Sequence, residues 1–150
     1  MWYNKVVSNL GEIPAFIDFY ERELLAARVD VKIQGKVEKE LSNLPGETEH
    51  RFNQLQEIEA VLEYLNIQLR KIRQKHYKKY LEAYQRALTS RDAEKYVDGE
   101  DEVIDFETII NEVALLRNKW LGIMKGLETK QWQMGHIVRL RTAGMEDITV

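Results

Sequence analysis

No glycine or proline interrupts the chain between Gly46 and Gly99, and apolar side chains recur in this stretch at alternating intervals of three and four residues. This spacing is the heptad pattern of a coiled-coil seam, which keeps one face of a helix apolar. The positions of the stripe are Leu55, Ile58, Leu62, Leu65, Leu69 and Ile72. We therefore expect a helix that Thr48 caps and that continues to about Leu88, roughly 60 Å long at about 1.5 Å per residue.

A second apolar stripe with the same spacing occupies the last third of the chain, and only Lys130 and Arg141 are polar in it. Its positions are Phe106, Ile109, Val113, Leu116, Trp120, Ile123, Leu127, Lys130, Met134, Ile137 and Arg141. Between the two stripes, a cap at Thr89 and Ser90 predicts a short helix that passes through Tyr96 and is closed by Asp98 and Gly99. The sequence therefore predicts an all-α, elongated helical hairpin. The 8 Gly and 2 Pro in 150 residues, about 7% against roughly 12% on average, also favour long helices.

The first 45 residues read as a separate helical arm. Apolar residues from Ile13 to Ala27 have helical spacing, and Pro14 lies in the first turn, where its missing N–H costs nothing. Val31, Ile33 and Val37 fit either an alternating strand or another helical turn, and we take residues 31–37 as a helical turn. Residues 43–46, Asn-Leu-Pro-Gly, have the composition of a tight turn. This turn would divide the arm, residues 1–45, from the hairpin body, residues 46–150.

Several classes of protein are excluded or disfavoured by what the sequence lacks. The absence of Cys removes disulfides, cysteine-ligated metals and thiol catalysis, and no run of 18 apolar residues could span a membrane. Glu47 and His50 have the spacing of di-iron helices, but only one such pair occurs, so we expect no metal site. Without a phosphate-binding loop or carboxylates tuned by burial, we expect no enzyme and no cofactor. The chain should be a soluble, cytosolic binding protein.

The formal net charge of −3 hides a strongly basic segment, because no acidic residue lies between Glu63 and Glu82. Cations interleaved with tyrosines there suit phosphate neutralisation and base stacking. The candidate nucleic-acid-binding residues are Arg70, Lys71, Arg73, Lys75, His76, Tyr77, Lys78, Lys79 and Tyr80. The alternative is a solvated basic face whose tyrosines pack in the core or pair with acids.

An acidic run follows, with the residues Asp98, Glu100, Asp101, Glu102, Asp105 and Glu107. Part of this run suits the positive N-terminal end of the last helix. The run is also the obvious partner of the basic segment, within one chain or between subunits. A gate is a further hypothesis, in which the acids cover the basic segment until nucleic acid displaces them.

The last helix carries Gly122 and Gly126, each of which costs up to about 1 kcal/mol against Ala inside a helix. The pair indicates close approach of another backbone, within the chain or between subunits. We expect the second stripe to form an oligomer interface, although an intramolecular core is nearly as good an explanation. The candidate oligomerisation residues are Leu116, Trp120, Ile123, Leu127, Met134 and Ile137.

Residues from about His50 to Asp147 resemble the UvsY family, the recombination mediator proteins of tailed bacteriophages. Lys71, Arg73 and Tyr77 stand as Lys-x-Arg-x-x-x-Tyr, similar to the family's basic motif for single-stranded DNA. The C-terminal likeness is carried by Trp132, Met134, His136, Ile137, Leu140 and Arg141, followed by Ala143 and Gly144.

The resemblance implies a non-enzymatic factor for DNA recombination, repair and replication that binds single-stranded DNA. Such a factor helps to load a RecA-like recombinase onto strands coated by single-strand-binding protein. It further implies a ring-like homo-oligomer, a hexamer or heptamer, that acts in the cytoplasm of the infected bacterial host. The alternative is a helical adaptor or structural subunit of a phage assembly, in which the basic segment meets an acidic protein partner.

Overall fold

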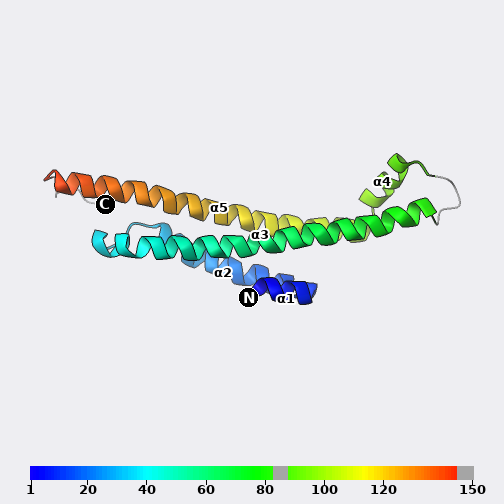
Figure 1. The fold of residues 1–150 in the computed structure, drawn as a ribbon, viewed down its shortest axis with the longest axis horizontal. Coiled ribbons are helices and arrows are strands. Elements are labelled where there is room, and N and C mark those ends of the chain that lie inside the picture. The colour runs from blue at the N-terminus through cyan, green and yellow to red at the C-terminus, as the bar shows by residue number, and fades with distance from the viewer. Residues whose placement is uncertain (83–87, 145–150) are drawn as a thin grey trace. The chain divides into compact units, whose positions relative to one another are not determined.

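The fold is known from a computed structural model, which describes residues 1–82 and 88–144 (Figure 1). Every regular element in these residues is a helix, so the all-α prediction is confirmed. The elements are α1 (Trp2–Ser8), the 3-10 helix η1 (Leu10–Glu12), α2 (Ile13–Val31), α3 (Val37–Glu82), α4 (Ser90–Asp98) and α5 (Asp101–Thr142). None of these helices is long and apolar enough to cross a membrane.

The chain divides into two compact units. Unit 1 combines residues Met1–Ile58 with Leu116–Val150, and unit 2 is Glu59–Leu115. The long helices α3 and α5 each contribute one part to each unit. The division does not coincide with the one expected at residue 45.

The turn predicted at residues 43–46 is wrong, because Pro45 lies inside α3. Thr48 is therefore an interior residue of the helix and not its cap. A proline inside a helix removes one hydrogen bond and costs about 3 kcal/mol. The helix nevertheless begins at Val37, and Val37 and Leu44 are both buried on its core face. Burial of the apolar residues that flank Pro45 offsets the cost of the proline.

The start of α2 is as predicted, with Pro14 in its first turn. The helical turn predicted over residues 31–37 is wrong, since α2 ends at Val31 and α3 begins only at Val37. Gly35 has a φ of 79°, a left-handed conformation that breaks the helix and suits glycine. The helix predicted to reach Leu88 ends at Glu82 in the described part of the chain. Residues 83–87 lie outside that part.

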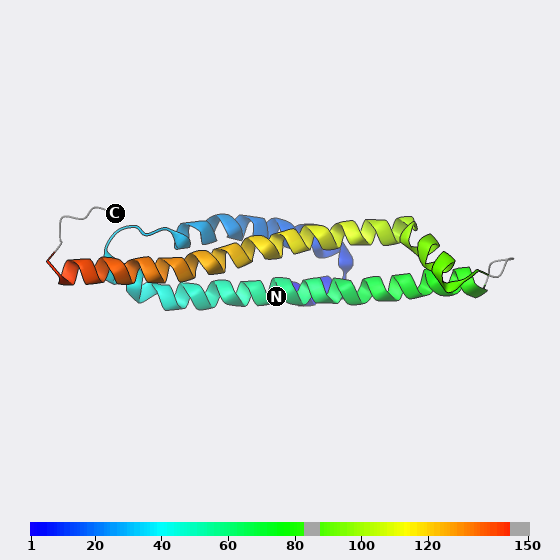
Figure 2. The same cartoon turned by 90° about the horizontal axis from the view of Figure 1, so that it is seen from above.

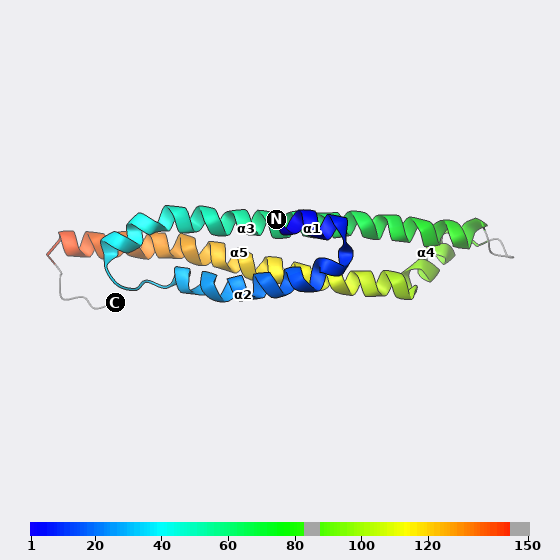
Figure 3. The same cartoon turned by 90° about the horizontal axis from the view of Figure 1, so that it is seen from below.

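In unit 1, α2 packs against α3 and α5, as the views in Figures 2 and 3 show. Phe16 and Tyr20 of α2 are buried and pack edge to face, and Tyr20 also meets the indole of Trp120 on α5 at 5.8 Å between ring centroids. The Tyr20 hydroxyl donates a hydrogen bond to Glu57 on α3 at 2.6 Å. Burial, more than this carboxylate, raises the pKa of Tyr20 well above its usual range.

Two buried cations hold the C-terminal end of α2. Arg51 of α3 donates from Nε to the Asp30 carboxylate at 2.8 Å and is paired with Glu23 at 3.2 Å. Lys130 of α5 has a side chain only 1% exposed, and its Nζ donates to the Asp30 carbonyl oxygen at 2.7 Å and to Glu40 at 2.6 Å. Lys130, the polar residue that interrupts the second stripe, is thus buried, and its ammonium group has acceptors on both α2 and α3.

Gly126 confirms the predicted close approach, and Gly122 does not. A Cβ placed on Gly126 would lie 2.7 Å from Cγ1 of Val31, the last residue of α2, whereas a Cβ on Gly122 would meet nothing within 4 Å. The close neighbour of Gly126 is a side chain of α2 and not another backbone. Only one of the two glycines is required by packing.

The stripe expected to form an oligomer interface is used by the chain's own core. Leu116, Trp120, Ile123, Leu127 and Met134 are all buried in unit 1, and Ile137 is half-buried. The apolar spacing identified a buried helix face correctly. We interpreted this face as a subunit interface because a periodic pattern cannot show that α2 covers α5.

Candidate nucleic-acid interface

The basic segment, residues 70–79, forms the last turns of α3 in unit 2. Unit 2 also contains α4 and the beginning of α5, whose side chains Ala93, Val97 and Val103 are buried, as are Leu62 and Leu65 of α3. The predicted caps of α4 are confirmed. The Thr89 side chain accepts a hydrogen bond from the backbone N–H of Asp92 at 3.2 Å, and Gly99 ends the helix. These caps fix where the acidic run begins.

One face of the basic segment lines a concave site of about 400 Å³ that we call the basic groove. Arg70, Arg73, Gln74 and Tyr77 lie on one side of α3 because they are three, four and seven residues apart. The α4 side of the groove is lined by Glu94 and Val97. Three of the predicted nucleic-acid-binding residues therefore meet at one site.

The adjoining face of the segment is covered by four carboxylates, Asp98, Glu100, Glu102 and Glu107, which we call the acidic clasp. The ion pairs are Arg73 with Asp98 at 2.7 Å and with Glu107 at 3.6 Å, Lys75 with Glu102 at 3.1 Å, and Lys79 with Glu100 at 3.5 Å. The acidic run therefore pairs with the basic segment of the same chain. Asp101 and Glu102 also lie in the first turn of α5, as expected for acids at a helix N-terminus.

His76 lies at the centre of the clasp and is buried, with 8% of its surface exposed. Its Nε2 is 2.7 Å from Glu102, and its Nδ1 is 3.7 Å from Glu100. His76 is the next position of the first stripe after Ile72, where the sequence ended the apolar pattern. The buried face of the helix continues at this position with a polar side chain, whose Nε2 contacts Glu102 while its buried Nδ1 has no hydrogen-bond partner among the described residues.

The clasp favours the charged form of its own acids. A hydrogen bond from the Tyr80 hydroxyl, with help from Lys79 and His76, lowers the pKa of Glu100. Hydrogen bonds from His76 and Lys75 lower the pKa of Glu102. Both carboxylates therefore stay ionised at lower pH than an isolated glutamate and hold the cations against α5.

The nine candidate residues fall into three groups. Arg70 and Tyr77 line the basic groove, and Arg73 belongs to both the groove and the clasp. Lys75, His76, Lys79 and Tyr80 contact the clasp, and the Tyr80 ring also stacks on Tyr96 at 5.2 Å between centroids. Lys71 and Lys78 are exposed and make no ion pair among the described residues.

Sequence reasoning missed the groove residues that are not basic or aromatic. Gln74 carries no charge, and Glu94 and Val97 belong to α4, whose position over α3 no local pattern reveals. No cluster of three potential metal ligands occurs among the described residues. Glu47, half of the pair considered for a metal, instead lies 3.8 Å from the buried Lys130.

Family models, curated proteins and solved structures were compared with the chain, and none matches it.

Proposed function

We propose that this protein binds single-stranded DNA through the basic groove and the lysines beside it, and that it acts without enzymatic activity. The observation that carries the proposal is the meeting of Arg70, Arg73 and Tyr77 at one concave site. Guanidinium groups neutralise phosphates, and an aromatic ring beside them offers a face on which a base can stack. Single-stranded DNA presents both groups together, whereas a duplex hides its base faces.

The clasp supports a competitive form of this binding. Each of its carboxylates occupies a cation that a phosphate would otherwise contact, as the Arg73–Asp98 distance of 2.7 Å illustrates. Exposed ion pairs are weak and are exchanged readily for other anions. DNA therefore binds first at Lys71 and Lys78, and then displaces Glu63 from Arg70 and the clasp from Arg73, Lys75 and Lys79.

We further propose, from the resemblance to the UvsY family, that the protein is a recombination mediator. It would load a RecA-like recombinase onto DNA coated by single-strand-binding protein, as a ring-like homo-oligomer of six or seven subunits. A ring would place several weak sites along one strand and raise their effective concentration. The likeness at Lys71, Arg73 and Tyr77 supports this role, since those residues lie in or beside the basic groove.

Fluorescence anisotropy with labelled oligothymidine tests the DNA-binding proposal. We expect binding whose logarithmic salt slope is steep and falls by about 1.4 in Lys71→Ala with Arg73→Ala, since each phosphate contact to a single strand contributes about 0.7. The matched control is Lys36→Ala with Lys39→Ala, which removes two cations from unit 1 and should leave the slope unchanged. Absence of binding at low salt contradicts the proposal.

A recombinase assay tests the mediator role separately. On strands coated by single-strand-binding protein, a RecA-like recombinase hydrolyses ATP only after a lag while it displaces the coat. We expect the protein to shorten this lag and the Lys71→Ala, Arg73→Ala variant to shorten it less. Normal DNA binding with no change of the lag would reject the mediator role and retain the DNA-binding proposal.

A second candidate function is an adaptor that binds an acidic protein, and the clasp itself favours it. The basic segment already binds four carboxylates of its own chain, which is the chemistry of an acidic peptide. Competition between oligothymidine and polyglutamate of matched charge distinguishes the two candidates. Displacement of oligothymidine only by a large excess of polyglutamate supports DNA as the ligand, and binding of polyglutamate alone supports the adaptor.

A further inference from the structure

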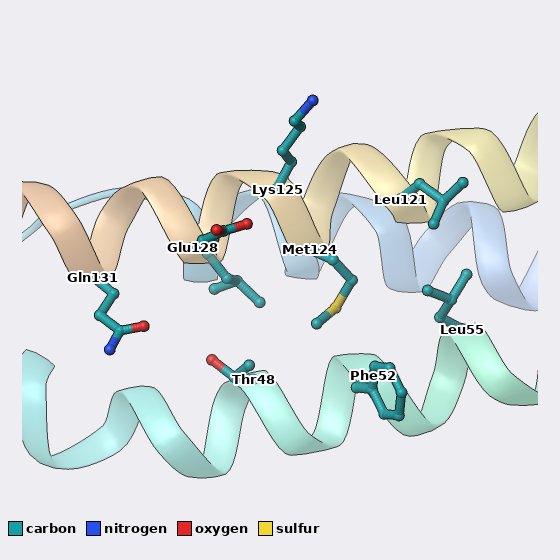
Figure 4. A pocket seen from close by; sticks show the side chains of 9 residues that line it. Thr48, Phe52, Leu55, Leu121, Met124, Lys125, Glu128 and Gln131 are labelled. Atoms are coloured by element: carbon teal, nitrogen blue, oxygen red, sulfur yellow. The ribbon is translucent and has the colours of Figure 1, made fainter.

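Unit 1 has an open groove between α3 and α5, which we call the α3/α5 groove (Figure 4). It consists of two adjoining cavities of about 500 and 580 Å³, which share Thr48, Phe52, Met124 and Gln131. Phe52 and Met124 approach each other across it from the two helices in Figure 4. The groove is an apolar channel with a polar rim.

Large apolar side chains on the walls of the groove are exposed to solvent. Phe52 is 48% exposed and Leu121 is 45% exposed. Helix α2 cannot cover them, because it packs on the other side of the α3 and α5 pair, where it reaches Arg51, Glu57 and Lys130. Helices α2, α3 and α5 therefore pack like three members of a helix bundle, and the position of a further helix is open along the groove.

The outward face of α2 carries an apolar ridge that suits the open helix position beside α3 and α5. Its inward face buries Phe16, Tyr20 and Leu24, while Leu25 and Val29 point away from the core and are 62% and 55% exposed. Leu25 and Val29 are four residues apart and therefore form a ridge along the helix. A ridge of this kind fits between two helices by the packing that is usual in bundles.

Charge favours the same pairing. The ridge is flanked by Arg28 and Lys32, and the rim of the α3/α5 groove carries Glu49 and Glu128. Among the described residues, no ion pair involves any of these four side chains. Lys125 is the one cation among the residues that line the two cavities. A basic-flanked apolar helix is thus the occupant that the groove suits best, and α2 of another copy is such a helix.

We propose that the α2 ridge of one copy docks into the α3/α5 groove of the next copy. The ridge and the groove lie on opposite sides of unit 1, so each copy that fills a groove presents its own groove onward. Such a heterologous contact propagates into a ring or a filament and cannot close as a dimer. The inference rests on the homo-oligomer of the proposed function, for which it supplies the interface, and does not depend on DNA binding.

Light scattering of complementary variants tests this interface. Leu25→Glu spoils the ridge, Phe52→Glu spoils the groove, and both replace exposed side chains, so circular dichroism should show folded protein. We expect an oligomeric wild type, two monomeric variants, and a heterodimer of twice the chain mass when the variants are mixed, because one intact ridge then meets one intact groove. Leu115→Glu, at a residue 57% exposed in unit 2, should remain oligomeric. A monomeric wild type, variants that stay oligomeric, or a mixture that stays monomeric overturns the proposal.

Disulfide trapping provides a second measurement, since the chain has no cysteine of its own. Val29→Cys mixed with Met124→Cys should give a covalent dimer under mild oxidation, and Leu115→Cys mixed with Met124→Cys should not. Equal cross-linking in both mixtures overturns the proposed contact. The monomeric variants keep the basic segment, so their binding to oligothymidine separates a failure of assembly from a failure of DNA binding.

Discussion

Replacing Gly122 and Gly126 by alanine in separate variants should change stability in opposite directions or by clearly different amounts. Alanine gains about 1 kcal/mol over glycine inside a helix, and at Gly122 nothing within 4 Å opposes that gain. At Gly126 the new Cβ would lie 2.7 Å from Cγ1 and 3.1 Å from Cγ2 of Val31. Valine has little rotamer freedom in a helix, and overpacking of this kind costs about 1–3 kcal/mol. The two variants should therefore differ by about 1–3 kcal/mol, with Gly122→Ala the more stable.

Urea unfolding followed by circular dichroism at one fixed protein concentration measures both variants, since assembly would otherwise shift the midpoint. A third variant, Gly126→Ala with Val31→Ala, removes the methyl groups that clash. We expect its two substitutions to be coupled favourably by about 0.5–3 kcal/mol, as residues in contact usually are.

Equal gains at Gly122 and Gly126 would refute the reasoning, because Val31 would then not lie against α5. Additive effects of Gly126→Ala and Val31→Ala would refute it as well. Either result would mean that the end of α2 packs elsewhere.

Three further changes test the ionic contacts. Glu100→Gln with Glu102→Gln should tighten oligothymidine binding several-fold at low salt, and unchanged anisotropy titrations would reject competition by the clasp. The pKa values of these two carboxyls are lowered, so their contribution to stability is present above the ordinary pKa of about 4.3 and should be lost as pH falls through the lowered values. Lys130→Met should cost about 3–5 kcal/mol in urea unfolding because it leaves Glu40 without its cation, and a loss below about 1 kcal/mol contradicts a buried pair. Burial raises the pKa of Glu47, so wild-type stability should fall as pH rises through that raised value. Urea unfolding of Glu47→Gln across this pH range should show a flatter profile, and an unchanged profile contradicts desolvation of the carboxyl.

Capping residues and apolar spacing predicted the helices correctly where tertiary packing favours the same structure. The caps at Thr89 and Gly99 bound α4 as expected, because capping depends on residues next to one another in the chain. Apolar spacing also located buried positions from Leu55 to Leu65 and from Val113 to Leu127. What covers each buried face was not predictable, since the contact of α2 with α5 joins residues about 100 positions apart, such as Asp30 and Lys130.

Local signals were wrong where tertiary burial overrides them. Pro45 and Gly46 have strong turn propensity, yet α3 runs through both and holds Val37 and Leu44 in the core. The helical turn expected over residues 31–37 is absent because Gly35 adopts a left-handed conformation there, and Val37 instead begins α3.

The candidate site was predictable as a set of charges and not as a shape. The composition of residues 70–79 and the acidic run after Asp98 indicated a basic segment and its carboxylate partner. Which cation meets which carboxylate depends on how α4 and α5 pack against α3, as the burial of His76 between Glu100 and Glu102 shows. The same packing decides that Arg70 and Tyr77 line a groove while Lys79 contacts the clasp.

The two buried cations of unit 1 converge on a single residue of α2. Arg51 binds the carboxylate of Asp30, and Lys130 binds its carbonyl oxygen. Sliding α2 along its neighbours by one helical turn, about 5.4 Å, would move Asp30 out of reach of both and leave two charges buried without their partners. Burial of apolar surface is less directional than these two polar contacts and depends less sharply on alignment. Asp30 therefore adds a polar constraint on the alignment of α2 with α3 and α5 to the one that the ring contacts of Tyr20 impose.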